Sequence, residues 1–255
     1  MIQDLVDSPL LVLVLSFVAL WTTARVSASY VRRAKLEEEV HKDFDFILSA
    51  TLTLLSLIIG FNLLVAVNRY DQRKNYEAEE ANAIGTAFLR ADLLPAADGA
   101  KLRKLLSSYA DQRVQFYTTR DDKKIGEINS RTAKLQAELW SAVTVPAQAQ
   151  PTPVIALAVS AMNDVLNSQA YSQAAWWNRI PLGAWGLMVA IAISCNVLVG
   201  YGVRDAKAVG GLLLILPFIV AISFFLIADV DSPRAGVIRV HPQNLESLAQ
   251  SLRAP

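Results

Sequence analysis

Cysteine and histidine are scarce in this 255-residue chain. Its single cysteine, Cys195, excludes an intrachain disulfide framework and a thiolate metal site. The two histidines, His41 and His241, lie far apart in the sequence, so no metal site is predicted. A formal net charge of +1 gives no reason to expect a nucleic acid as a partner.

Motifs that mark common catalytic or nucleotide-binding sites are also missing. The sequence contains no G-x-S-x-G, H-E-x-x-H, Walker loop or G-x-G-x-x-G pattern. We therefore predict no enzyme activity, no catalytic residue and no cofactor. Proton pumps and many ion-coupled transporters place carboxylates or histidines within their membrane spans, whereas the long apolar runs of this chain hold a single charged residue, Asp45, next to the first residue of the second run. A passive pore is compatible with that composition.

Four apolar runs approach the length that crosses a bilayer. They are Leu10–Ala24, Phe44–Val67, Leu182–Val203 and Val209–Ala228. The first run could be read as a cleaved signal peptide, but Asp4 and Asp7 precede it where such a peptide carries positive charge. The sequence therefore predicts an all-α integral membrane protein with four transmembrane helices and the lipid bilayer as its solvent.

The second run continues without proline into a charged, helix-forming stretch that Pro95 is the first residue to interrupt. Three further amphipathic stretches follow, and the Pro- and Gln-rich segment 144–153 predicts a linker before the last of them. These stretches predict an extramembrane helical bundle inserted between the second and third membrane helices. The expected domains are 1–68 (membrane helices 1 and 2), 69–181 (bundle), 182–228 (membrane helices 3 and 4) and 229–255 (C-terminal tail).

The orientation in the membrane follows from basic residues in short loops, which stay on the cytoplasmic side. The connector 25–43 and the turn 204–207 carry such residues and fall on one side of a four-span protein. We therefore expect both termini and the bundle on the opposite, outer side.

Small residues recur at helical spacing along the second run. Ser49, Thr53, Ser56 and Gly60 share one face, which either packs against another helix or lines a narrow permeation path. Asn62 lies off that face and needs a hydrogen-bond partner or a polar cavity. A comparable stripe in the third run predicts helix packing and comprises Gly183, Gly186, Ala190 and Ser194.

Charged residues follow the second and fourth runs. Arg69 and Arg73 lie one helical turn apart, either as part of a salt-bridged helix surface or as a cationic ring at a pore mouth. Asp229 and Asp231 precede a turn signal at Pro233 and are weak candidates for a cation site.

Several segments resemble the signature of bacterial bestrophin-like membrane proteins. They are GFNLLVAVNRYDQR, EEANAIGTAFLRADLLP, SSYADQR and DSPRAG. The resemblance extends more distantly to true bestrophins, which are pentameric anion channels with a hydrophobic neck on their second membrane helix. It implies a homo-oligomer, inorganic anions as partners, Ile58, Ile59 and Phe61 as neck candidates, and Asn62 as a polar lining residue. The tryptophan-rich motif of true bestrophins is replaced here by Tyr70-Asp71-Gln72.

The leading hypothesis is thus a bestrophin-like protein of the bacterial inner membrane that forms a homo-oligomeric anion channel. The alternative is a membrane-anchored helical module for sensing, binding or scaffolding, without transport. A hydrophobic neck that limits ion flux distinguishes the first hypothesis from the second.

Overall fold

The computed structural model describes residues 7–31, 38–203 and 211–253, and these are helical with no strand among them. Four helices are long and apolar enough to cross a membrane, which confirms the predicted all-α class and the four candidate spans. The basic residues at 32–35 and 204–207, on which the predicted orientation depends, lie outside the described residues. The elements are α2 (Pro9–Val31), α3 (Glu38–Arg90), η1 (Ala91–Leu93), α4 (Ala96–Thr118), α5 (Asp122–Ala149), α6 (Pro153–Trp177), α7 (Leu182–Gly202), η2 (Leu212–Leu214), α8 (Ile215–Asp231) and α9 (Gln243–Ser251).

The chain divides into two compact units. Unit 1 comprises Met1–Arg69 and Arg179–Arg239, and unit 2 comprises Tyr70–Asn178 and Val240–Pro255. Unit 1 contains the apolar half of α3, and unit 2 contains its charged half. The C-terminal helix α9 belongs to unit 2 although it follows the last apolar helix in the sequence.

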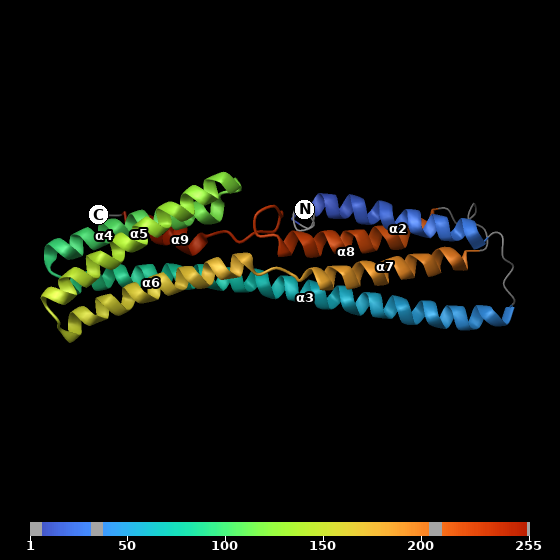
Figure 1. Ribbon diagram of the computed structural model, residues 1–255, viewed down its shortest axis with the longest axis horizontal. Coiled ribbons are helices and arrows are strands. Elements are labelled where there is room, and N and C mark those ends of the chain that lie inside the picture. Colours follow the sequence, from blue (N-terminus) through green and yellow to red (C-terminus); the bar gives the residue numbers. More distant parts are fainter. Residues whose placement is uncertain (1–6, 32–37, 204–210, 254–255) are drawn as a thin grey trace. The chain divides into compact units, whose positions relative to one another are not determined.

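In unit 1, α2 packs against both α7 and α8 (Figure 1). Small residues make the crossing with α7 close: Ala24 and Ala28 are buried, and Gly200 lies against the backbone of Ala24. The Ser27 hydroxyl donates to the Val197 carbonyl over 2.7 Å. Close backbone approach through small residues, with a hydroxyl bridging the helices, is the usual packing mode of membrane helices.

The stripe predicted to pack on α7 is exposed within this chain. Gly183 and Gly186 have nothing near the position of a Cβ atom, and Ala190 and Ser194 are exposed as well. The close contact is made instead by Gly200, two turns beyond the stripe. A single sequence marks which face of an apolar helix is small, but not which neighbour covers it.

The helix α3 runs without a break from Glu38 to Arg90, as the uninterrupted pattern before Pro95 predicted. The short turn η1 follows, and Pro95 then stands as the N-cap of α4. At the same end of the bundle, where α6 contacts η1, the Thr152 hydroxyl accepts from Ile155 N and Pro153 occupies the first turn of α6. Pro95 and Thr152 thus mark the starts of α4 and α6.

The predicted linker 144–153 is partly wrong, because α5 continues to Ala149 with Pro146 inside it. Proline removes one backbone hydrogen bond from a helix. The helix nevertheless continues, since Ala142, Val143 and Pro146 are buried and Val143 belongs to the bundle core. Tertiary packing therefore outweighs the local preference for a break.

Unit 2 is a helical bundle built from the charged half of α3 with α4, α5, α6 and α9 (Figure 1). Its core contains large apolar and aromatic side chains from these helices, among them Ile84, Leu106, Tyr109, Phe116, Leu139, Met162, Trp176 and Leu245. Burial of this apolar area provides the main driving force for its folding.

Candidate functional site

The hydroxyl face of α3 is exposed within unit 1. Ser49, Thr53, Ser56 and Gly60 are all exposed, so they are available to lipid, to other copies of the chain or to a pore. The Thr53 and Ser56 hydroxyls donate to the carbonyls of Ser49 and Leu52, four residues earlier, over 2.8 and 2.9 Å.

The four residues predicted around a pore neck do not share one face of α3. Ile58, Ile59 and Asn62 are half-buried, and the Asn62 amide donates to the Ile58 carbonyl over 2.9 Å. Phe61 is 55% exposed. At about 100° per residue, Phe61 lies roughly 160° around the helix from Ile59.

Two residues that sequence reasoning missed lie beside Phe61. Leu57 and Leu64 are 52% and 56% exposed, and they stand four residues before and three after Phe61 on the same face. The spacing was visible in the sequence, but apart from Asn62 the positions from Leu57 to Leu64 are apolar or glycine, so nothing distinguished this face from the face of Ile59. Burial within unit 1 makes that distinction.

At the end of its apolar half, α3 joins an ion-pair cluster in unit 1. Arg69 lies 3.8 Å from the Asp231 carboxylate. Arg179 donates to the Asp231 carbonyl over 2.9 Å and pairs with Asp7 at 2.7 Å. The Asp231 carboxylate also accepts from Ile180 N over 3.1 Å. Asp231 therefore ties together α3, the start of α7 and the end of α8.

The second carboxylate of that region, Asp229, closes the turn after α8. It accepts from Val237 N at 2.7 Å and Ile238 N at 2.8 Å. A Cβ atom at Gly236 would overlap the Asp229 carbonyl oxygen, so the turn requires glycine for close backbone approach. The carboxylates of Asp229 and Asp231 thus serve backbone and arginine partners, and no cluster of potential metal ligands occurs among the described residues.

Arg73 lies in unit 2, where its side chain is 1% exposed. Its guanidinium donates to the Ala175 carbonyl over 3.2 Å and to the Asn178 carbonyl over 3.3 Å. Both acceptors belong to the carboxyl end of α6, where a cation is favoured by the unpaired carbonyls and the helix dipole. The predicted role at a pore mouth stays a prediction, while the structure gives Arg73 an anchoring role.

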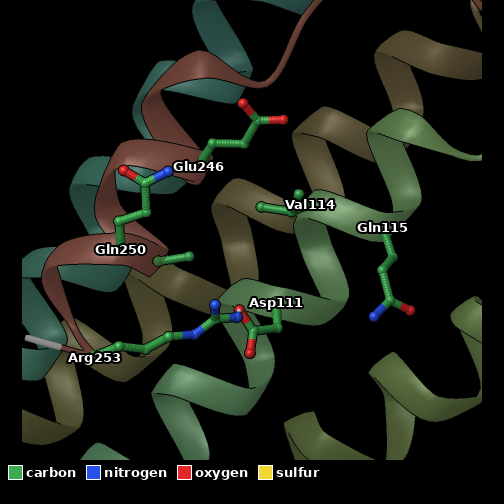
Figure 2. Close-up of a pocket in the computed structure, with 7 residues that line it drawn as sticks. Asp111, Val114, Gln115, Glu246, Gln250 and Arg253 are labelled. Carbon is green, nitrogen blue, oxygen red and sulfur yellow. Dashed lines mark hydrogen bonds and ion pairs between the residues drawn. The ribbon is translucent and has the colours of Figure 1, made fainter.

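The start of α9 is capped by a side chain from α3. The buried Glu77 carboxylate accepts from Leu245 N over 2.8 Å and from the Asn244 amide over 2.7 Å. Beyond the end of α9, Arg253 pairs with Asp111 on α4 (Figure 2). The Arg253–Asp111 pair borders a groove of about 280 Å³ between α4 and α9. The C-terminal helix is therefore fixed to the bundle at both ends.

A buried ion pair lies at the centre of unit 2. Glu80 on α3 and Arg113 on α4 are both 0% exposed and pair directly, with a second bond of 3.2 Å from Arg113 Nη2 to Glu80 Oε2. Arg113 also lies 4.4 Å over the Phe116 ring. The Ser172 and Tyr117 hydroxyls, 2.7 Å apart, complete the group on α6 and α4.

The charges of this group act on each other because solvent is excluded. Burial opposes ionisation of Arg113, but the adjacent Glu80 charge raises the pKa of its guanidinium above the ordinary value. Burial and the Glu80 charge both raise the pKa of Tyr117, so its hydroxyl is protonated at neutral pH. Sequence reasoning named none of these residues as a site, although Glu80 and Arg113 lie in the quoted segments EEANAIGTAFLRADLLP and SSYADQR.

The helices and their apolar spans define the class of this molecule as an all-α, multi-pass membrane protein. The model of the Bestrophin-like domain matches residues 10–245, and the chain belongs to that family. A comparison with curated proteins finds no match.

Solved structures of bacterial bestrophin homologues from Klebsiella pneumoniae share the fold. One variant matches with a TM-score of 0.68 at 11% identity, covering 94% of this chain and 97% of that chain. A second structure matches with a TM-score of 0.66 at 12% identity, covering 95% of each chain. At such identity the likeness establishes the bestrophin-like fold, and the site residues have to be argued from this chain itself.

Proposed function

We propose that this chain assembles as a homo-oligomer in the bacterial inner membrane and conducts small inorganic anions through a pore lined by α3. The observation that carries the proposal is the exposed apolar face at Leu57, Phe61 and Leu64, which the rest of unit 1 leaves uncovered. Membership of the Bestrophin-like family and the shared fold support a channel rather than an enzyme.

The neck in this proposal lies on the face of Phe61, flanked by Leu57 and Leu64. Hydrophobic constrictions gate ion flow by excluding water. The exposed hydroxyl face at Thr53 and Ser56 either packs against another copy or turns its O–H groups from the helix carbonyls towards passing anions. Arg69 and Arg73 hold helix ends through Asp231 and the α6 carbonyls, so we assign them positioning roles.

We expect Leu57→Ala and Phe61→Ala to raise ion flux several-fold in proteoliposomes, because a smaller side chain lets the constriction hydrate. Chloride, nitrate and potassium fluxes are measured separately, so that the anion preference is tested together with conduction. Leu187→Ala on α7 is the matched control, since Leu187 is 51% exposed but lies on another helix. The proposal fails if wild-type fluxes match empty vesicles and both α3 variants leave them unchanged.

The bundle is proposed to lie outside the bilayer on the outer face, following the basic loops at 25–43 and 204–207. A topology reporter inserted at the exposed Ser130 should then be found on the outer side. A reporter within the 25–43 connector should be cytoplasmic. The reverse result for the two positions would overturn the orientation without affecting the proposed neck.

A further inference from the structure

The turn between α4 and α5, with the first turns of α5, carries a cluster of basic side chains. We call residues 120–134 the basic tip; they include five Lys or Arg and three Asp or Glu, a net charge of +2. The five basic residues are exposed: Arg120, Lys123, Lys124, Arg131 and Lys134. Several of them border a shallow hollow on α5 together with Gly126 and Ser130.

Contacts inside unit 2 place the basic tip at one end of the bundle. Phe116 and Tyr117, close to the end of α4, contact the Trp176 ring with centroid separations of 5.1 and 5.4 Å. Trp176 is the penultimate residue of α6. The α4–α5 turn therefore lies at the end of the bundle where α6 stops, as can be followed within the bundle in Figure 1.

That end of the bundle is where the chain passes into its apolar helices. The helix α6 ends at Trp177, and α7, a candidate membrane span, begins at Leu182. Five residue steps can reach at most about 18 Å, so the chain itself holds Trp177 within that distance of Leu182. Trp177 is 73% exposed, as suits an aromatic side chain at a membrane interface.

We propose that the basic tip binds the anionic phospholipid headgroups of the bilayer that holds the chain's own spans. Basic residues close to a membrane span attract anionic lipids, and the attraction is screened within a Debye length. Charge complementarity and the short linker to α7 favour this occupant over an acidic protein. Contact between the basic tip and the bilayer would then depend on the anionic lipid content of the membrane. This dependence does not require ion conduction.

The test uses the full chain with a single fluorescent label at the tip. Gly126→Cys provides the attachment site, because a Cβ atom there meets open space, and Cys195→Ser removes the buried native thiol. The labelled protein is reconstituted in zwitterionic vesicles and in vesicles with about 30% phosphatidylglycerol. Quenching by acrylamide, a neutral molecule, reports how far water reaches the label.

We expect quenching to fall about twofold in the anionic vesicles and to recover in about 0.5 M salt. The variant Lys123→Gln/Lys124→Gln/Arg131→Gln should lose the difference, since glutamine keeps helix propensity but removes charge. Lys101→Gln/Lys104→Gln is the matched control, because these exposed residues lie in the first half of α4, away from the tip.

Three results would overturn the proposal. Equal quenching in both vesicle types would show that lipid charge does not reach the tip. An undiminished difference in the tip variant would assign the effect to other residues. Protection by soluble glycerol phosphate in zwitterionic vesicles would identify a site for free anions instead of a bilayer contact. Ion flux enters none of these measurements, so failure here leaves the proposed pore to its own test.

Discussion

Replacing Arg113 by alanine is expected to lower the free energy of unfolding by about 3–5 kcal/mol, one of the largest effects for a single change in unit 2. The substitution leaves the Glu80 carboxylate fully buried without its cation. It also removes the guanidinium from the face of Phe116 and from the Ser172 hydroxyl. An uncompensated buried charge costs far more than the hydrogen bonds that are lost with it.

Thermal unfolding in detergent, followed by circular dichroism at 222 nm, measures this cost. The double variant Glu80→Gln/Arg113→Met should recover part of the loss, because both charges are removed together. The control is Arg103→Ala, which breaks the ion pair with Asp92 on the surface, where the two side chains are 34% and 67% exposed. That change should cost at most about 1 kcal/mol. Equal melting of the Arg113 and Arg103 variants would refute the assigned role of the buried pair.

This buried pair explains why parts of the signature segments are charged at positions that face no solvent. Glu80 and Arg113 meet across 33 residues of sequence, and both belong to segments that suggested the family. Their polarity therefore has a structural cause within the bundle. The charges of Glu80 and Arg113 therefore say nothing about ions in a pore, although the segments that contain them resemble a family that includes channels.

Local signals predicted the helices better than their partners. The interruption at Pro95 was predicted from the sequence, whereas the N-cap at Thr152 fell inside the predicted linker 144–153. The helix through Pro146 depends on burial of Val143, which no local pattern reveals. The acceptors of Arg73 lie more than 100 residues away on α6, so its anchoring role required the tertiary structure.

The candidate neck shows the same limit. The residues from Ile58 to Asn62 all belong to a nearly uniform apolar helix, and only Asn62 is polar. Periodicity identifies a buried face where polar and apolar residues alternate, and here they do not. Exposure in unit 1 separates Phe61 from Ile59, and it adds Leu57 and Leu64 to the candidates.

The second large effect is expected at the crossing of α2 and α7. A Cβ atom at Gly200 would overlap the Ala24 carbonyl oxygen and approach the Ser27 Cβ atom to 2.9 Å. Both obstacles belong to α2, and one of them is backbone, so a side-chain rotation cannot relieve the overlap. Gly200→Val should therefore separate the helices, break the Ser27–Val197 hydrogen bond and cost about 3 kcal/mol, the upper part of the range for overpacking.

Gly186→Ala tests whether this cost comes from the crossing or from the loss of a glycine in α7. The same helix has open space at Gly186, and alanine favours a helix over glycine by about 0.8–1.0 kcal/mol. Unfolding by dodecyl sulfate in mixed micelles should thus show a less stable Gly200→Val protein and an unchanged or more stable Gly186→Ala protein. If both variants lose the same stability, the contact between α2 and α7 does not depend on Gly200. If Gly186→Ala alone is destabilised, the small-residue stripe packs against another copy of the chain, which would support the proposed homo-oligomer.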